Sequence, residues 1–439
     1  MVVGTGRRLA VLLLAVALIG APAAVLRVRC AGASCRPSTA AGAPAPFCSL
    51  PAGLRSLITA GTYEGRSPDV LGVGGDQPLV SIVDYVNGRP IRVPWPSDDA
   101  ATASAMSVPL LFIGRSIHAQ ELSSDLGLDQ IAPTLEPILG LHRPHPEVRS
   151  GQAIPGVVPT STLAPLVVLI VWKGVGTPDV GATRTPWLDR RARSESTNAA
   201  SGSASARSLP LDPAAVETTI GTGALPSQHG VTGTWLRGDN GRIDLAYGRG
   251  APVPVVASLG DDLDRATHGA AKIGLIQGRP EDVGLTGDAW YGTGPVRDRT
   301  VRHGADIAAD VTGFLRNGWG DDAIPDLLAV PLSGLPAHDD RATSEIVDAV
   351  LAAVPGATIV VAGTGSLRTG PAALPAEPIG VVATAGGSPS GGFFVDRQPG
   401  STTTAQDVVD VMRGQTTSTG APVYADAFAS YAVRFGRYC

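Results

Sequence analysis

The stretch Leu166-Val167-Val168-Leu169-Ile170-Val171-Trp172 decides the fold of this chain, because it is a continuous apolar run rich in β-branched residues. Such a run predicts a strand that is buried on both faces, as in the centre of a parallel sheet. The glycine-rich loop Lys173-Gly174-Val175-Gly176 follows directly. Open α/β sheets bind their ligands at the carboxyl ends of the strands, so we expect the functional site beside this loop.

Segments typical of strands and helices alternate along the chain on both sides of this run. Further buried strands are expected at 108–114, 327–330 and 358–361, and helices at 303–317 and 341–354. Asp340 is placed to cap the second of these helices. Residues 190–208 are polar and low in complexity, which favours a surface insertion. The alternation predicts an α/β fold of three layers, a mostly parallel central sheet with helices on both faces.

The composition is that of a large globular protein without a nucleic-acid partner. Of the 439 residues 44% are hydrophobic, which is ample for a sizeable core, and 17% are charged. The formal net charge of −5 does not favour the basic surface that nucleic-acid binding requires. The chain has only two lysines, Lys173 and Lys272. Sheets of this size often form one domain, and we expect one over residues 48–439.

The N-terminus has the features of a targeting segment. Arg7 and Arg8 precede an apolar run from Leu9 to Leu26. Residues 1–26 are either a signal peptide, cleaved near Ala21-Pro22-Ala23, or an uncleaved signal anchor. In both cases the body of the protein lies outside the cytoplasm, and this segment is its one expected contact with the membrane. Residues 27–47 are rich in Pro and Ala and indicate a linker.

The four cysteines fit an oxidising compartment, where they allow three disulfide connectivities. Cys48 opens the expected domain and Cys439 closes it. Because the ends of a compact domain often lie near each other, we expect Cys48 to pair with Cys439, and Cys30 with Cys35. Metal binding is the weaker alternative, because no Cys-x-x-Cys pair accompanies these residues.

Two sets of motifs carry a resemblance to a known family. The first set is the apolar run at 166–172, a helix from Asp212-Pro213 to Thr222-Gly223, and Pro226-Ser227-Gln228-His229-Gly230. The second set is Arg66-Ser67-Pro68-Asp69, Val108-Pro109-Leu110-Leu111, and the short helix in Asp129–Leu141. Together they resemble the alkaline phosphatase superfamily, in its type I phosphodiesterase/nucleotide pyrophosphatase branch.

The order of the two sets is reversed relative to that family. Residues 48–151 resemble the family's C-terminal part and residues 165–439 its N-terminal core, with 152–164 as the connection. The resemblance therefore implies a circularly permuted chain, which is tolerated when the original termini lie close together. The alternative is an unrelated N-terminal domain that is similar by chance.

The resemblance also implies which reactive residues have been replaced. The family hydrolyses phosphate or sulfate esters with two metal ions, usually zinc, which activate a Ser or Thr nucleophile. Lys173 stands where the family has a metal-binding Asp, and Pro213 stands at the nucleophile. Thr364-Gly365 replaces an Asp-His pair, and the acid-rich stretch near Asp98 lacks the last His. No alignment of His338 with a metal-binding His supplies its partner Asp, so we expect no zinc and no family-type catalytic residue.

Lys173 remains the most informative candidate. A buried ammonium is costly to desolvate, so we expect it to meet a carboxylate, first Asp212 and second Asp98. Such a fixed cation would help to hold an anionic ligand, whereas the alternative is a solvated loop lysine. The amides of Gly363–Ser366 are a further candidate anion cradle. The candidate binding residues are thus Lys173, Asp212, Thr364, Asp98 and His338.

The remaining conspicuous residues have structural interpretations. His229 is expected to shape its loop, Thr218 and Thr219 to bond within their helix, and His142 and His145 to lie in a surface turn.

Two functions follow. The first is an extracytoplasmic pseudo-hydrolase that binds an envelope protein or a small anion, or has a structural role. The second is an active phosphodiesterase or phosphatase with a rebuilt site, drawn from Asp98, Asp99, Asp212, His338, Asp339 and Asp340.

Overall fold

The computed structural model describes residues 46–74, 79–84, 89–93, 99–158, 163–193, 198–288, 290–292, 296–302, 304, 306–366, 368–369, 392–395, 404–414 and 424–435. The chain divides into Met1–Ala43 and Pro44–Cys439, and every described residue belongs to the second unit. The targeting segment expected at 1–26 therefore lies outside the described residues, as do Cys30, Cys35, Asp98 and Cys439. Within the described ranges no helix is both long and apolar enough to cross a bilayer.

A nine-stranded sheet forms the centre of the fold. Its strands follow the order β12-β11-β13-β7-β14-β4-β8-β5, with β6 pairing to β8. Their bounds are β4 (Ser107–Gly114), β5 (Gln120–Glu121), β6 (Leu126–Gly127), β7 (Leu166–Trp172), β8 (Ala199–Ser205), β11 (Ile273–Gln277), β12 (Arg299–Arg302), β13 (Asp326–Leu332) and β14 (Thr358–Gly363). All seven residues of β7 are buried, and Leu169 lies between Ala329 and Val360 of its parallel neighbours. The predicted central strand and the predicted mostly parallel sheet are confirmed.

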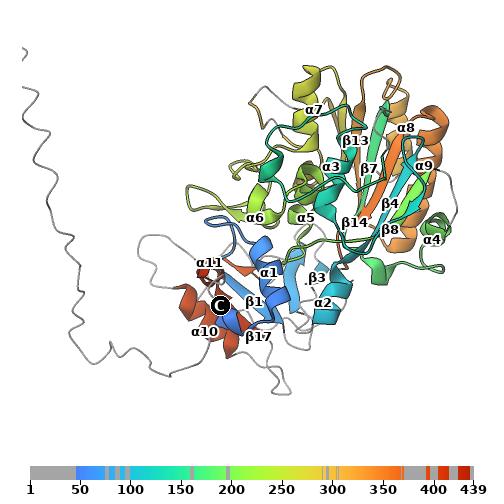
Figure 1. Ribbon diagram of the computed structural model, residues 1–439. Coiled ribbons are helices and arrows are strands. Elements are labelled where there is room, and N and C mark those ends of the chain that lie inside the picture. The colour runs from blue at the N-terminus through green and yellow to red at the C-terminus, as the bar shows by residue number, and fades with distance from the viewer. Residues whose placement is uncertain are drawn as a thin grey trace, which may run out of the picture. The chain divides into compact units, whose positions relative to one another are not determined.

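Strand β4 belongs to this sheet although it precedes β7 and the other strands of the sheet in the chain (Figure 1). It runs antiparallel to β14, with Phe112 opposite Val360. The prediction that this strand shares one sheet with β7 is confirmed, and residues 107–114 do not belong to a separate N-terminal domain.

Two apolar layers lie on opposite faces of the sheet, because successive side chains of a strand point in opposite directions. Val167, Leu169 and Val171 belong to a core cluster shared with α3 (Ile131–Leu135), α5 (Pro213–Thr222) and α7 (Leu259–Thr267). Val168, Ile170 and Trp172 belong to the opposite cluster, shared with α4 (Pro186–Arg193), α8 (Ile307–Leu315) and α9 (Pro336–Ala353). Figure 1 shows these two groups of helices on either side of the strands, which is the predicted three-layer arrangement.

Two local predictions are wrong. Residues 190–208 are not a surface insertion, because Ala199–Ser205 form β8 and pair with β4 along its length. The small Ala, Ser and Gly side chains of this strand lack the β-branched signal of the other strands. Asp340 does not cap α9, which begins at Pro336; its carboxylate instead accepts hydrogen bonds from Trp187 N (2.9 Å) and Leu188 N (2.8 Å) at the start of α4.

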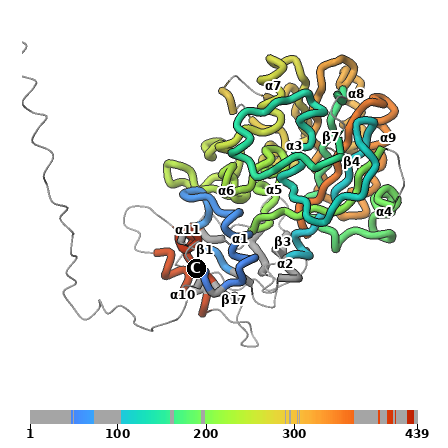
Figure 2. The backbone as a smooth tube through the Cα atoms, in the orientation of Figure 1, coloured from blue at the N-terminus to red at the C-terminus, as the bar shows by residue number. Residues whose placement is uncertain are grey.

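The two ends of the folded body meet in a smaller sheet of order β16-β1-β17. In it β1 (Val70–Gly74) pairs with both β16 (Gly392–Phe393) and β17 (Tyr424–Ala429). Figure 2 shows α1 (Ala52–Ala60) beside α11 (Tyr431–Phe435), near the same end of the body.

The remaining elements are α2 (Asp99–Met106), α6 (Pro226–His229), α10 (Ala405–Arg413), β2 (Leu79–Asp84), β3 (Arg89–Val93), β9 (Trp235–Arg237), β10 (Ile243–Leu245), β15 (Arg368–Thr369), η1 (Pro46–Ser49), η2 (Leu128–Gln130), η3 (Pro146–Val148), η4 (Thr177–Asp179) and η5 (Pro280–Leu285).

The position of Cys48 fits a link between the ends of the chain. Cys48 is not a free thiol, and its neighbour Phe47 packs against Phe428 with ring centroids 5.2 Å apart. The other three cysteines lie outside the described residues. The pairings Cys48–Cys439 and Cys30–Cys35 therefore stay predictions.

Helix α5 lies against η5 at backbone distance. A Cβ atom added at Gly221 would lie 2.1 Å from the carbonyl oxygen of Gly284, and one added at Gly284 would lie 2.7 Å from Thr218 Oγ1. Only glycine fits at such an approach, since the obstructing atom at Gly221 is backbone. This contact fixes how the side chains of α5 meet those of η5.

We predict that Gly221→Ala destabilises the protein by at least about 2 kcal/mol, because the added methyl group forces α5 away from η5. The matched control is Gly53→Ala in helix α1, where an added Cβ meets nothing within 4 Å. The control should be neutral or slightly stabilising, since alanine favours helix over glycine. Urea denaturation of both variants measures the difference, and equal stabilities would contradict the close packing.

Candidate functional site

Lys173 is the first residue after the central strand β7, and its amide donates to Leu332 O of the neighbouring strand (2.8 Å). Its side chain is 9% exposed. The ammonium nitrogen lies 2.5 Å from Asp282 Oδ1, 3.1 Å from Glu217 Oε1 and 3.6 Å from Glu281 Oε1. We call these four residues the Lys173 cluster. It occupies the carboxyl end of the parallel strands, the edge at which the sequence predicted a functional site.

Two elements, α5 and η5, supply the three carboxylates. Glu217 projects from the middle of α5, where every residue from Ala214 to Thr222 is buried. Glu281 and Asp282 lie in η5, just after β11. Asp282 is fixed by its second oxygen, Oδ2, which accepts hydrogen bonds from Gly278 N and Arg279 N at 2.7 Å each. The contact between α5 and η5 thus brings Glu217 to the acids of η5.

The charges of the cluster do not cancel if every group is ionised. Burial opposes a charged Lys173, yet the carboxylates of Glu217, Glu281 and Asp282 together raise the pKa of its ammonium above the usual value. Arg279 adds a second cation, with Nη1 3.7 Å from Glu281 Oε1. Burial raises the pKa of Glu217 well above its usual value, and the neighbouring acids Asp282 and Glu281 raise it further. The raised pKa of Glu217 thus acts against the excess of negative charge around Lys173 and Arg279.

The expectation that Lys173 meets a carboxylate is confirmed, and the alternative of a solvated loop lysine is excluded. The expected first partner, Asp212, is wrong. Asp212 is instead the N-cap of α5: its Oδ1 accepts from Ala214 N (3.0 Å) and from Thr234 Oγ1 (2.9 Å). Its Oδ2 is buried without a hydrogen-bond partner among the described residues, and burial raises the pKa of this carboxyl to about 6. Asp98 lies outside the described residues.

The helix that follows Asp212 carries no free hydroxyl at its start. Pro213 is the first residue of α5, a position that suits proline because its missing N–H would have no helical partner. Thr218 Oγ1 donates to Ala214 O (2.7 Å) and Thr219 Oγ1 donates to Ala215 O (3.0 Å). Both threonines thus bond within the helix, as predicted.

His229 shapes its loop, as predicted. Its side chain is buried, its Nδ1 accepts from Val231 N (3.1 Å), and its Nε2 lies 3.1 Å from Thr219 Oγ1. Because Nδ1 is an acceptor, the neutral ring carries its proton on Nε2 and donates it to Thr219. Burial lowers the pKa of His229 to about 3, so the ring is neutral at physiological pH. His142 and His145 are exposed, in the predicted surface turn.

The predicted anion cradle at Gly363–Ser366 is wrong. Thr364 N donates to Trp172 O, Gly365 N to Val175 O and Ser366 N to Ala105 O, at 3.1, 3.2 and 2.8 Å. The Thr364 hydroxyl accepts from Gly174 N (2.8 Å). The amides of Thr364 and Gly365 link the ends of β14 and β7, and the amide of Ser366 bonds to α2, so these three amides are not available to a ligand.

Of the residues proposed for a rebuilt catalytic site, Asp339 and Asp340 each have a local partner, and the side chains of Asp98 and Asp99 lie outside the described part of the structure. His338 is 53% exposed at the side chain, with Nδ1 3.7 Å from Asp339 Oδ1. The same oxygen of Asp339 accepts from Gly334 N (3.1 Å), and burial raises the pKa of Asp339 to about 6. The carboxylate of Asp340 accepts hydrogen bonds from the backbone amides at the start of α4. None of these contacts joins His338, Asp339 or Asp340 to Asp212.

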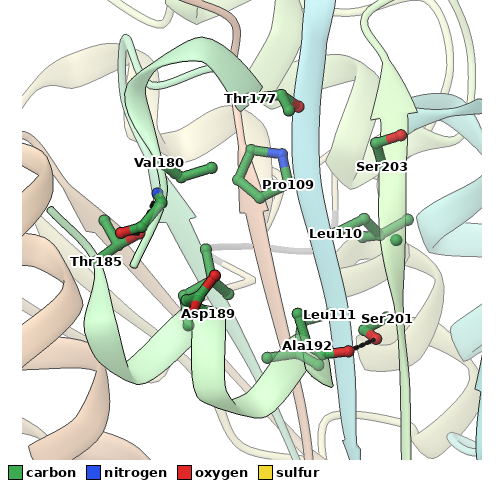
Figure 3. Close-up of a pocket in the computed structure, with 13 residues that line it drawn as sticks. Pro109, Leu110, Leu111, Thr177, Val180, Thr185, Asp189, Ala192, Ser201 and Ser203 are labelled. Carbon is green, nitrogen blue, oxygen red and sulfur yellow. Dashed lines mark hydrogen bonds between the residues drawn. The ribbon is translucent and has the colours of Figure 1, made fainter. Parts of the chain in front are cut away.

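A small pocket of about 140 Å³ lies apart from the Lys173 cluster, between α4 and strands β4 and β8 (Figure 3). Leu111, Val180 and Leu188 contribute to its largely apolar lining. Its polar groups are engaged locally, as Ser201 Oγ donates to Ala192 O (3.1 Å) and Asp189 pairs with Arg193 (2.6 Å). The pocket shares no lining residue with the cluster.

Among the described residues, no group of three or more His, Cys, Asp or Glu side chains is arranged to hold a metal ion. Comparison with known proteins adds no assignment, because no family model, no curated protein and no solved structure matches the chain. The site is therefore defined by its geometry alone.

The three acids of the cluster are not among the site residues that the sequence predicted. Two signals were available: Glu217 is the one charged residue of the helix Pro213–Thr222, and Glu281-Asp282 closely follow the strand Ile273–Gln277. Both place acids at the carboxyl edge of the sheet.

We predict that Lys173→Met destabilises the protein by about 3–5 kcal/mol, because it leaves buried carboxylates without their cation. The matched control is Lys272→Met, the only other lysine, whose side chain is 30% exposed beside Asp321, Asp322 and Asp326. Two of its partners, Asp321 and Asp322, are exposed, and the buried Asp326 keeps hydrogen bonds from two backbone amides, so the control should cost no more than about 1 kcal/mol. Chemical denaturation measures both, and a Lys173→Met variant as stable as the control would exclude a buried ion cluster.

We predict that Asp212→Asn gains stability relative to the wild type as the pH rises. The folded-state pKa of about 6 lies above the ordinary 3.8, so ionised Asp212 costs stability above pH 6 and nothing below pH 3.8. The difference between the two proteins should change by about 2 kcal/mol between pH 4 and pH 7. Any pH-independent effect of the amide cancels in this comparison. A flat difference across the range would show that Asp212 is not buried as described.

Proposed function

We propose that this protein is an extracytoplasmic, non-hydrolytic member of the alkaline phosphatase superfamily, with a binding or structural role at the cell envelope. One observation carries the proposal. At the carboxyl end of the central strand, where an α/β enzyme binds its ligand, the Lys173 ammonium is held by three carboxylates of the protein itself. The edge that would carry chemistry is occupied by an internal ion cluster.

The residues around α5 also argue against nucleophilic catalysis. Pro213 has no hydroxyl, and the hydroxyls of Thr218 and Thr219 donate to carbonyls of their own helix. A nucleophile needs a base within hydrogen-bond reach, with a pKa near the working pH. His229 lies 3.1 Å from Thr219, but its pKa of about 3 makes it a weak base.

The fold supports the family assignment without establishing it. The three-layer arrangement with a mostly parallel sheet is the one that the resemblance implies. Circular permutation belongs to the proposal, and two features favour it: β4 lies within the main sheet, and β1 pairs with β17 at the other end of the chain. Chain ends that lie together are what a permuted chain requires.

The cluster narrows the kind of partner that we propose. An anionic ligand at Lys173 would face three carboxylates, of which Glu217 and Asp282 are at most 1% exposed at the side chain. The positive potential expected of Lys173 is therefore already compensated. We propose that the partner is an envelope protein, and that the targeting segment at 1–26 carries the domain out of the cytoplasm.

The alternative is an active phosphodiesterase or phosphatase with a rebuilt site. The raised pKa values of Asp212 and Asp339, about 6 in each case, are the feature that favours it, because a carboxyl with such a pKa can exchange protons near neutral pH. The two carboxyl groups have separate partners, which is why we prefer the non-hydrolytic proposal.

We predict that the purified protein retains no stoichiometric zinc after dialysis and does not turn over an aryl phosphodiester, with or without added zinc. Elemental analysis and a chromogenic assay test this, and an active phosphodiesterase serves as the positive control. Turnover that survives further purification, and is lost in Asp212→Asn or Asp339→Asn, would establish the alternative. Bound zinc without turnover would refute the metal-free part of the proposal.

A further inference from the structure

The three acids of the Lys173 cluster converge on one point, and the lysine nitrogen occupies it. The distances to Asp282, Glu217 and Glu281 are 2.5, 3.1 and 3.6 Å, and their side chains are 1, 0 and 4% exposed. Both carboxyl oxygens of Glu217 are buried and have no hydrogen-bond partner among the described residues, although Oε1 forms an ion pair with Lys173. The three acids therefore form a cage with unused acceptor capacity around a single cation.

The dimensions of the cage suit an ammonium rather than a metal ion. Charge-assisted N–H···O bonds are about 2.7–2.9 Å long, whereas zinc, magnesium and calcium bind carboxylate oxygens at about 2.0–2.6 Å. Two of the three distances here exceed 3 Å. The Lys173 ammonium donates a hydrogen bond to Asp282 Oδ1 and forms ion pairs with Glu217 and Glu281. Unlike a metal ion, an ammonium does not require a fixed coordination geometry.

We propose that Glu217, Glu281 and Asp282 form a binding site for a primary ammonium, and that the tethered Lys173 side chain is its resident ligand. The cation ties together the end of β7, helix α5 and η5, from which these residues come. While the tether is in place the site is closed to free cations. This inference rests on the geometry of the cluster and is independent of family membership and of hydrolytic activity.

The experiment removes the tether and supplies the ligand in solution. Lys173→Ala deletes the side chain beyond Cβ, which is the equivalent of n-propylammonium. Thermal unfolding of the full chain is followed with increasing propylammonium chloride, with tetramethylammonium chloride at the same ionic strength, and with magnesium, calcium or zinc chloride. Wild type and Lys272→Ala are the controls. We expect propylammonium to raise the Tm of Lys173→Ala by several degrees in a saturable manner, and to leave both controls unchanged.

Three further results decide the matter. The rescue should disappear in Lys173→Ala/Asp282→Asn, because the shortest contact of the cage is lost. If propylammonium does no more than tetramethylammonium, which has no N–H donor, the proposal is overturned. If a divalent metal stabilises Lys173→Ala more than propylammonium does, the site is a metal site and the ammonium assignment fails.

Should Lys173→Ala not remain folded without ligand, the yield of refolding with propylammonium or with tetramethylammonium gives the same comparison. A higher yield with propylammonium alone supports the site, and equal yields overturn it.

Discussion

A buried ammonium must be surrounded by groups that replace its water, and in this protein that requirement organises the functional edge of the sheet. Lys173 follows the fully buried strand β7, so its side chain starts inside the molecule. Glu217 and Asp282 reach it from α5 and η5, which are far from β7 in the sequence. The ion cluster thus joins three elements of the fold, and removing its one central cation would leave several carboxylates buried without compensation.

The cluster depends in turn on a steric constraint. Gly221 and Gly284 allow α5 and η5 to touch at their backbones, and a side chain at Gly221 would strike a carbonyl oxygen. This close approach sets the position of Glu217 relative to Asp282. Hydrogen bonds from two backbone amides then orient Asp282 toward the ammonium. Packing between glycines and electrostatics between charged groups therefore act on the same pair of elements.

The sequence predicted the parts of the structure that depend on local patterns. The apolar run of β7 identified the central strand, and the short apolar runs at 108–114 and 358–361 identified its companions β4 and β14. Strand β8 was not predicted, because its small Ala, Ser and Gly residues have no strand propensity of their own. Its strand conformation depends on pairing with β4. The acidic partners of Lys173 were not predicted for another reason. Asp282 lies 109 positions away in the sequence, and only tertiary packing brings it to Lys173. Asp212 was the predicted partner and lies closer to Lys173 in the sequence, but its carboxylate caps the N-terminus of α5 instead.

Nuclear magnetic resonance of the lysine side chains tests the central claim most directly, that Lys173 is a buried ammonium held by carboxylates. Because the chain has only two lysines, protein labelled with ¹⁵N-lysine gives two side-chain signals, and a Lys272→Arg variant assigns them. We predict that the Lys173 ammonium exchanges slowly with water and stays protonated beyond pH 10.5, where an ordinary lysine is half ionised. A rapidly exchanging signal that titrates as an ordinary lysine would contradict the account.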